Sequence, residues 1–247
     1  MDRTNVLLLV GATSDIGHAV ALRYARAGWR ILLTARDPAS AARNGDDIAA
    51  RTGASVEILR LDITDTGGFD AFVSGLTPLP DTVVCAVGEL GDQGLAQSDA
   101  GHAANVIAVN FTGPALLLGR LAEAFERRGT GTLVGISSVA GDRGRGSNYV
   151  YGSAKAGFTA FLSGLRNRLA RSGVHVLTVK PGFVRTRMTR DMRLPPVLTA
   201  EPQEVADAIF MAAQERRTNV LYVRRIWQLV MAVIGAIPEP MFLRLRL

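Results

Sequence analysis

The chain has 247 residues, enough for one large domain whose core needs neither disulfides nor a structural metal. Its single cysteine, Cys85, excludes an internal disulfide, and its three histidines are too dispersed for a metal-ligand cluster, so no metal site is expected. The 28 Lys and Arg against 22 Asp and Glu give a net charge of +6, but the arginines form no basic stripe, so nucleic acid is not an expected partner. The apolar run 6–10 is too short for a secretory signal, which predicts a cytoplasmic protein.

Strand-sized apolar runs alternate along the chain with segments of helical spacing. The expected strands cover residues 5–10, 30–34, 55–61, 82–87, 131–137, 174–180 and 219–223. Residues 16–27 and 202–214 predict helices, the first closed by a left-handed Gly28. Regular alternation of this kind predicts one α/β domain, a doubly wound parallel sheet with helices on both faces. Ligands are then expected beyond the carboxyl ends of the strands.

A glycine-containing turn follows the first expected strand and leads into a helix. Gly11 allows the tight turn and Gly17 allows close packing of the helix, while free N–H groups at the helix start can bind a pyrophosphate. Two glycines also occur in plain strand–helix connections, so the position after the first strand carries the prediction. The residues expected to contact a dinucleotide here are Gly11, Thr13, Ser14, Asp15, Ile16 and Gly17.

The end of the second expected strand bears on the choice of dinucleotide. An Asp or Glu there would bind the ribose 2′-hydroxyl of NAD, which Ala35 cannot do. Arg36 can pair with the 2′-phosphate of NADP through its guanidinium. NADP(H) is therefore favoured. NAD(H) stays open, because Arg36 can instead be a solvent-exposed arginine and Asp37 can still reach the ribose.

Four polar residues predict acid–base chemistry. Tyr151 and Lys155 are four residues apart, which places both side chains on one face of a helix. A tyrosine with a pKa of about 10 is a poor acid and base near neutrality, and a nearby ammonium favours its phenolate. Ser138, at a strand end, can hydrogen-bond a substrate carbonyl, and Asn110, after the helical segment 105–109, can hold a water for proton exchange. Tyr-x-x-x-Lys alone is common on surface helices, so the combination indicates the chemistry.

With these motifs in this order, the sequence resembles the classical short-chain dehydrogenase/reductase family over residues 6–223. The resemblance implies a single Rossmann-like NAD(P)-binding domain at 1–225, followed by an apolar tail at 226–247. It also implies that Asn110, Ser138, Tyr151 and Lys155 form a catalytic tetrad, with Tyr151 as proton donor in carbonyl reduction and Lys155 on the nicotinamide ribose. The other cofactor contacts that the family implies are Asp62 and Ile63 beside adenine, Ala86, Val87 and Gly88 beside its ribose, and Pro181, Gly182, Val184 and Thr186 around the carboxamide.

Two positions depart from the family pattern. Asp15 replaces the usual middle glycine of the turn, which can bring a carboxylate towards the cofactor diphosphate and weaken cofactor binding. The alternative is that Asp15, in the first turn of the helix, complements the helix dipole and that its side chain points away from the cofactor. Residues 85–88 lack the usual Asn-rich form, which affects the cofactor contacts there and leaves the tetrad intact.

The apolar tail is a second source of expectations. Residues 226–237, which carry Trp227, make about 18 Å of helix, too short to span a bilayer. This segment can lie among lipid headgroups, cover a lipid-binding cleft, or form a buried helix or dimer contact. Through residues 88–92, 150–153, 185–188 and this tail, the chain looks most like the decaprenylphosphoryl-2-keto-ribose reductase group. Arg185, Arg187 and Arg190 would then face a substrate phosphodiester, the alternative being a surface cluster.

The leading hypothesis is an NADPH-dependent oxidoreductase that interconverts a ketone and a secondary alcohol on a hydrophobic or lipid-linked substrate such as a polyprenylphosphoryl keto-sugar. The alternative substrate is a 3-oxoacyl thioester. A hypothesis of another class is a nucleotide-binding regulator without chemistry, against which the intact tetrad argues. The apolar segments 104–125 and 158–169 predict a homo-oligomer, either dimer or tetramer, and the tail leaves open a peripheral contact with the inner face of the membrane.

Overall fold

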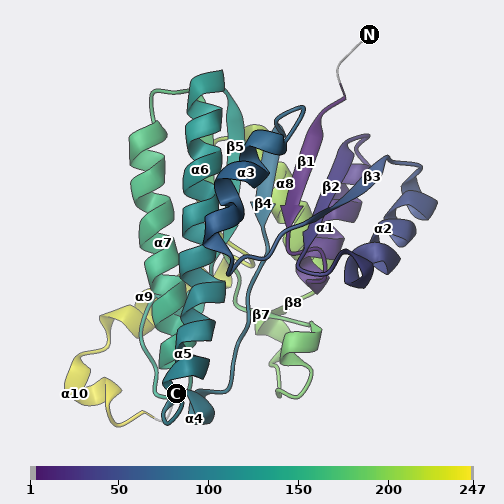
Figure 1. Cartoon of the computed structure of the whole chain (residues 1–247). Coiled ribbons are helices and arrows are strands. Elements are labelled where there is room, and N and C mark those ends of the chain that lie inside the picture. Colours follow the sequence, from purple (N-terminus) through teal and green to yellow (C-terminus); the bar gives the residue numbers. More distant parts are fainter. Residues whose placement is uncertain (1–3, 246–247) are drawn as a thin grey trace.

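The computed structural model describes residues 4–245, which form a seven-stranded parallel sheet between two layers of helices (Figure 1). The strands of the sheet are β1 (Val6–Val10), β2 (Arg30–Ala35), β3 (Val56–Arg60), β4 (Thr82–Cys85), β5 (Gly131–Ile136), β6 (Val174–Lys180) and β9 (Val220–Tyr222). Their order is β3-β2-β1-β4-β5-β6-β9, and a separate parallel pair joins β7 (Phe183–Val184) to β8 (Thr199–Ala200). The doubly wound α/β prediction is therefore confirmed, with each expected strand present.

Ten α-helices are found among the described residues. They are α1 (Asp15–Ala25), α2 (Pro38–Thr52), α3 (Phe69–Gly75), α4 (Gln93–Ala96), α5 (Ala100–Ile107), α6 (Gly113–Arg128), α7 (Tyr149–Leu169), α8 (Pro202–Glu215), α9 (Ile226–Ala236) and α10 (Glu239–Phe242). The shorter turns are η1 (Thr66–Gly68), η2 (Ala108–Thr112), η3 (Val139–Gly141), η4 (Arg187–Thr189) and η5 (Pro196–Leu198), of which η2 is π-helical. Helix α1 ends at Ala25, two residues earlier than expected, and Gly28 beyond it has a positive φ of 81°.

At the crevice, two expectations about boundaries were wrong. Strand β4 ends at Cys85 rather than at residue 87, because the chain leaves the ladder after Ala86 donates its N–H to the Val10 carbonyl at 2.8 Å. Asn110 does not follow a helix that ends at residue 109, because it lies inside η2, which joins α5 to α6 without a break. Both corrections concern the edge of the crevice at the carboxyl ends of the strands.

The sheet is buried on both faces. Leu7 and Leu9 of β1 pack in the core formed with α1, α2 and α8, whereas Val6, Leu8 and Val10 pack in the core formed with α3, α6 and α7. Successive side chains of a strand point to opposite faces, so a continuous apolar run can fill both cores at once.

One helical stretch has the length and apolar composition of a membrane span. Residues Ala100–Arg128 comprise α5, η2 and α6. Leu117, Leu118, Leu121 and Phe125 within it are fully buried against the sheet. The stretch is therefore a core helix of the fold.

Helix α9, yellow in Figure 1, is the short apolar C-terminal helix that the sequence predicts. Trp227 and Met231 are buried, and they pack with Val139 of η3 and Phe183 of β7. The side chain of Arg143 holds the end of the helix by donating to the carbonyls of Ile234 and Ile237 at 2.6 Å each. The inner face of α9 therefore covers the region where η3 and β7 meet.

Candidate active site

The turn between β1 and α1 lies very close to the backbone of Ala86 and Val87, which follow β4. Gly11 has a φ of 100°, and a Cβ there would lie 3.0 Å from the side chain of Val87 and 3.1 Å from its nitrogen. A Cβ on Gly17 would lie 2.7 Å from the Gly11 carbonyl oxygen. Only glycine fits both places, and the result is a narrow crevice that faces the positive end of the α1 dipole. This geometry suits a pyrophosphate.

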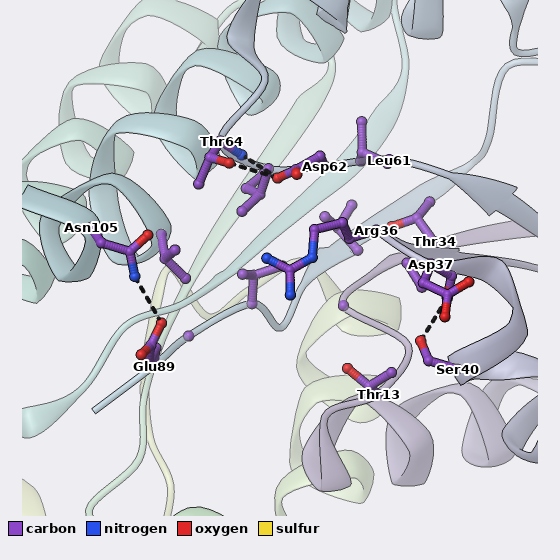
Figure 2. A pocket seen from close by; sticks show the side chains of 17 residues that line it. Thr13, Thr34, Arg36, Asp37, Ser40, Leu61, Asp62, Thr64, Glu89 and Asn105 are labelled. Atoms are coloured by element: carbon purple, nitrogen blue, oxygen red, sulfur yellow. Dashed lines mark hydrogen bonds between the residues drawn. The ribbon is translucent and has the colours of Figure 1, made fainter. Parts of the chain in front are cut away.

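A cavity of about 530 Å³ opens from this turn, at the carboxyl ends of β1, β2 and β4 and beyond β3 (Figure 2). The expected cofactor residues that line it are Gly11, Thr13, Arg36, Asp62, Ile63, Val87 and Gly88. Arg36 extends its guanidinium into the middle of this cavity, and no carboxylate among the described residues forms an ion pair with it (Figure 2). An unpaired cation beside a helix N-terminus suits a phosphate-bearing ligand.

Two carboxylates at this cavity are held by local hydrogen bonds. Asp37 caps α2 by accepting the Ala39 N–H at 3.1 Å. Asp62 accepts the N–H and hydroxyl of Thr64 at 2.9 and 2.7 Å (Figure 2), and these bonds lower the pKa of its carboxyl group. The carboxylate of Asp37, the group that the sequence leaves open as a partner for the ribose of NAD, thus caps the start of α2.

A second cavity of about 360 Å³ shares Val87 and Gly88 with the first. The expected site residues that line it are Ser14, Ile16, Ala86, Val87, Gly88, Ser138, Tyr151, Lys155, Pro181, Gly182, Val184 and Thr186. Its remaining walls are largely apolar. The two cavities together give a crevice suited to a dinucleotide, with an adjoining pocket for a second ligand.

Tyr151, Lys155 and Ser138 meet in the second cavity. The Lys155 Nζ donates to the Ile136 carbonyl at 3.1 Å and lies 5.7 Å from the centroid of the Tyr151 ring. Ser138 hydrogen-bonds the Tyr151 side chain, and its own Oγ accepts the Ala140 N–H at 3.1 Å. The strand end of β5 and the first turns of α7 thus supply three polar groups to one wall of the cavity, and Lys155 is the buried one of the three.

Burial controls the ionisation of this cluster. It raises the pKa of Tyr151 to about 12, although the hydrogen bond from Ser138 acts in the opposite direction. It lowers the pKa of Lys155 to about 8, because the ammonium is removed from water. The expectation that Lys155 favours the Tyr151 phenolate is therefore outweighed by burial. Tyr151 is a neutral phenol near pH 7, the form that can donate a proton.

Asn110 is fully buried and holds the loop after β4. Its Nδ2 donates to the carbonyls of Glu89 and Val106 at 2.7 and 2.8 Å, and its Oδ1 lies 3.2 Å from the Glu89 nitrogen, from which it accepts. A π-helical turn displaces a residue from the regular helical register and is frequent at functional sites. The turn directs the Asn110 side chain at the backbone beside Gly88, where the two cavities join.

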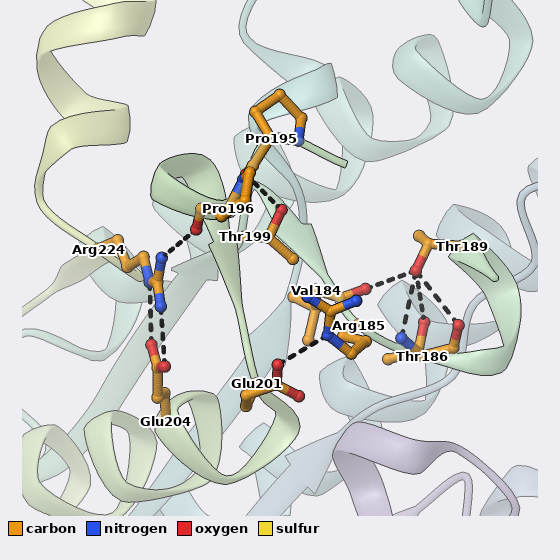
Figure 3. A network of polar contacts seen from close by, with 10 residues as sticks. All are labelled: Val184, Arg185, Thr186, Thr189, Pro195, Pro196, Thr199, Glu201, Glu204 and Arg224. Atoms are coloured by element: carbon orange, nitrogen blue, oxygen red, sulfur yellow. Dashed lines mark hydrogen bonds and ion pairs between the residues drawn. The ribbon is translucent and has the colours of Figure 1, made fainter. Parts of the chain in front are cut away.

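Asp15 lines neither of the two cavities. Its carboxylate accepts the Arg187 N–H at 2.7 Å and the Arg187 Nε at 2.8 Å, so it points away from the crevice. Arg185 pairs with Glu201 at 2.8 Å (Figure 3), and Arg190 pairs with Asp191 at 3.4 Å. Each of the three arginines expected to face a substrate phosphodiester therefore has a carboxylate partner of its own.

The segment after β6 is held by a polar network (Figure 3). Thr189 donates to the Val184 carbonyl at 2.6 Å and closes η4 against Thr186. Arg224 binds both oxygens of Glu204 at 2.9 Å and donates to the Pro196 carbonyl at 2.9 Å. These contacts fix the wall of the second cavity on the side of β7 and β8.

Several residues of the second cavity were not predicted from sequence as site residues. These are Leu90, Arg145, Ser147, Asn148, Phe183, Met188, Thr189, Met192 and Trp227. Trp227 was noted in the tail, but its place at the cavity depends on α9 folding back over Gly182. A Cβ on Gly182 would overlap the indole ring, so the contact is close. No spacing in the sequence signals such a contact between distant segments.

Comparison with known proteins agrees with this geometry. The family model for short chain dehydrogenases matches residues 5–196, and the chain belongs to this family. It is an NAD(P)-dependent oxidoreductase of that fold. An uncharacterized oxidoreductase of Mycobacterium tuberculosis is 37% identical, with 100% of this chain and 96% of that protein covered. Acetoacetyl-CoA reductase of Allochromatium vinosum is 29% identical, with 85% of this chain and 92% of that protein covered.

A solved structure shows the same architecture. The short-chain dehydrogenase from Sphingobium yanoikuyae, in complex with NADPH, superposes with a TM-score of 0.81. It is 26% identical in sequence, and the match covers 95% of this chain and 97% of that one. The family and fold implied by the sequence motifs are therefore confirmed. The resemblance to the keto-ribose reductase group finds no support in these comparisons.

Proposed function

We propose that this protein is an NADPH-dependent reductase that converts a hydrophobic ketone to a secondary alcohol. The observation that carries the proposal is that Tyr151, Ser138 and the buried Lys155 meet where a dinucleotide-sized crevice joins an apolar pocket. A regulator that only senses a nucleotide would need the crevice alone.

The crevice fits NADP(H) in three respects. The glycine turn leaves room for the diphosphate, the start of α1 offers N–H donors to it, and Arg36 supplies an unpaired guanidinium for a 2′-phosphate. Asp37 is occupied as the cap of α2, which favours NADP over NAD. When bound, NADPH supplies a hydride to the carbonyl carbon and leaves as NADP⁺.

The protein's own residues handle the proton. Ser138 and Tyr151 hydrogen-bond the carbonyl oxygen and so polarise the ketone. Tyr151 donates its proton to that oxygen as negative charge develops, and the Lys155 ammonium stabilises the phenolate left behind. The phenolate then regains a proton from solvent. Asn110 holds the Gly88–Glu89 backbone, and a water bound near it is the expected route for that proton.

The pocket gives the substrate class. Apolar side chains from β7, η4 and α9 favour a ketone with a hydrocarbon body, because its burial contributes about 25 cal/mol per Å². A 3-oxoacyl thioester is the second candidate, favoured by the likeness to acetoacetyl-CoA reductase. A polyprenylphosphoryl keto-sugar is a narrower third candidate. The exposed apolar side chains of Leu229 and Val233 on α9 support this candidate, because they can contact a membrane, although they can equally contact another subunit. Arg185, Arg187 and Arg190 do not support it, because each is paired with a carboxylate.

The experiment is NADPH and NADH oxidation by purified protein offered a hydrophobic ketone, a short 3-oxoacyl thioester and a polyprenylphosphoryl 2-keto-pentose in parallel. Tyr151→Phe is the control, and it should keep NADPH binding and lose turnover about 10²- to 10⁴-fold. Turnover of one substrate alone selects among the three candidates. Full activity of Tyr151→Phe, or NADPH binding without reduction of any carbonyl, would overturn the proposal.

A further inference from the structure

The second cavity carries positive charge without a carboxylate to balance it. Its lining contains two basic residues, Lys155 and Arg145, and no Asp or Glu. The ammonium of Lys155 already has contacts, because it donates to the Ile136 carbonyl and lies beside the Tyr151 ring. Arg145 has no role in the proposed proton transfer and therefore needs an explanation of its own.

Arg145 lies in the loop between η3 and α7, and it has no ion-pair or side-chain hydrogen-bond partner among residues 4–245. Its Nε is buried without a hydrogen-bond partner. Arg143, two residues earlier, differs in its contacts, since it binds the Ile234 and Ile237 carbonyls and pairs with Glu239 at 2.9 Å. Arg143 is thus a structural residue that fixes the C-terminal helices, and Arg145 is available to a ligand.

A partly buried guanidinium without a counter-ion costs free energy. Burial lowers the pKa of Arg145, yet an arginine stays charged in proteins because its reference pKa exceeds 12. A buried charge is tolerated when it is paired and hydrogen-bonded, so an incoming anion would remove this cost. The planar fork of donors on arginine matches the oxygens of a carboxylate or a phosphate.

The neighbourhood of Arg145 leads to the reaction centre. Asn148, three residues on, also lines the cavity, and its Oδ1 is buried without a hydrogen-bond partner. Its N–H donates to the Arg145 carbonyl at 3.1 Å, which closes the turn before α7. Tyr151 follows three residues later. One wall of the cavity therefore presents an unpaired guanidinium, an amide oxygen without a partner and the Tyr151 hydroxyl in succession.

We propose that Arg145 binds an anionic group of the substrate, so that the preferred substrate is a ketone carrying a carboxylate or a phosphate on an otherwise apolar chain. This inference rests on the proposed reductase function and narrows its substrate class. The chemistry of the step is unchanged, since hydride still adds to the carbonyl carbon and Tyr151 still protonates the oxygen. Asn148 accepts a hydroxyl hydrogen where the substrate carries one near the anion.

The first test is kinetic. Straight-chain oxoacids of one length, with the ketone at different distances from the carboxylate, are compared with their methyl esters and with phosphorylated ketones of similar length. We expect kcat/KM for the best anionic ketone to exceed that of its neutral partner about tenfold or more, the range of a hydrogen-bonded charge pair. The carboxylate and phosphate series identify which anion the site prefers.

Variants assign the preference to one residue. Arg145→Met should reduce the ratio of anionic to neutral turnover to about one, and Arg145→Lys should restore part of the ratio. Arg127→Met is the matched control, because it removes the same charge from the exposed surface of α6, where Arg127 pairs only loosely with Glu123 at 3.8 Å. Equal turnover of acids and esters by the wild type, or a ratio unchanged in Arg145→Met, would overturn the inference.

Binding separates this inference from the proposed reaction. The protein is titrated with octanoate and with methyl octanoate, and binding is followed by tryptophan fluorescence, because Trp227 forms part of the cavity wall. Tighter binding of octanoate that is lost in Arg145→Met supports the anion site even if no ketone is reduced, in which case only the reductase proposal fails. Equal binding of both ligands, unaffected by Arg145→Met, overturns the anion site even if neutral ketones are reduced.

Discussion

Arg187 of η4 and Asp15 of α1 are 172 residues apart in sequence and joined by two hydrogen bonds of 2.7 and 2.8 Å. The arginine also donates to the Thr13 carbonyl, so one side chain connects the loop after β6 to the turn after β1. The carboxylate of Asp15 is thereby paired with a positive charge and kept out of both cavities. The same contact holds η4 at the edge of the second cavity, where Thr186 and Met188 line the wall.

This pairing predicts the effect of Asp15→Ala. We expect KM for the ketone to rise about two- to fivefold with kcat little changed, because an exposed ion pair contributes roughly 0.2–1 kcal/mol to holding η4. Stability should fall by less than about 1 kcal/mol. Asp47→Ala, which removes contacts with Arg51 and His18 outside the two cavities, is the control and should leave KM unaltered. Tighter NADPH binding by Asp15→Ala would show instead that the carboxylate opposes the cofactor.

Arg36 predicts the cofactor preference. Arg36→Ala should weaken NADPH binding about 10- to 100-fold, since hydrogen bonds to a charged group contribute roughly 1.5–3 kcal/mol, and should change NADH binding little. Dissociation constants from cofactor fluorescence measure both effects. Arg26→Ala, an exposed arginine at the end of α1, serves as the control. An equal loss for NADPH and NADH would mean that Arg36 acts on some other part of the dinucleotide.

Lys155 predicts a pH dependence. Its pKa is about 8, below the ordinary 10.5, so the ammonium is present below pH 8 and lost above it. Ketone reduction should therefore slow as the pH rises through about 8, because the Tyr151 phenolate loses its stabilising charge. The unfolded chain binds more protons than the native one between pH 8 and 10.5, so this group makes the free energy of unfolding rise with pH in that window.

A kcat/KM profile between pH 6 and 10 measures the kinetic effect. Tyr151, whose pKa is about 12, stays protonated over this range and does not itself cause a decline. The residual activity of Lys155→Met should show no decline near pH 8. A decline that persists in this variant would assign it to another group.

The contact between Gly182 and Trp227 predicts a non-additive pair. Gly182→Ala should destabilise the fold by about 1–3 kcal/mol, as overpacking does, because the new methyl group overlaps the indole ring. Trp227→Ala should cost roughly 3–5 kcal/mol on its own. The double variant should be less destabilised than the sum of the two, since the clash is gone. Urea unfolding measures all three, and strict additivity would mean that the helix does not press on Gly182.

The periodicity of the sequence determined the fold. Each strand of the sheet is a short apolar run, and such runs fill both cores because side chains alternate between the faces. Tyr151 and Lys155 share a helix face through their spacing alone, and the place of the glycines directly after β1 predicts the tight turn found there. These features are local, so chemistry and spacing along the chain are enough to predict them.

Only the tertiary structure decided which charges are available. Arg185, Arg187 and Arg190 cluster in sequence but have carboxylate partners, two of them in distant segments, while Arg145 has none among the described residues. Burial keeps Tyr151 a neutral phenol, because the loss of hydration around it outweighs the neighbouring Lys155 ammonium. The place of Trp227 over Gly182 likewise depends on how α9 folds back. Pairing and desolvation are set by groups far apart in the chain, and a sequence pattern does not contain those distances.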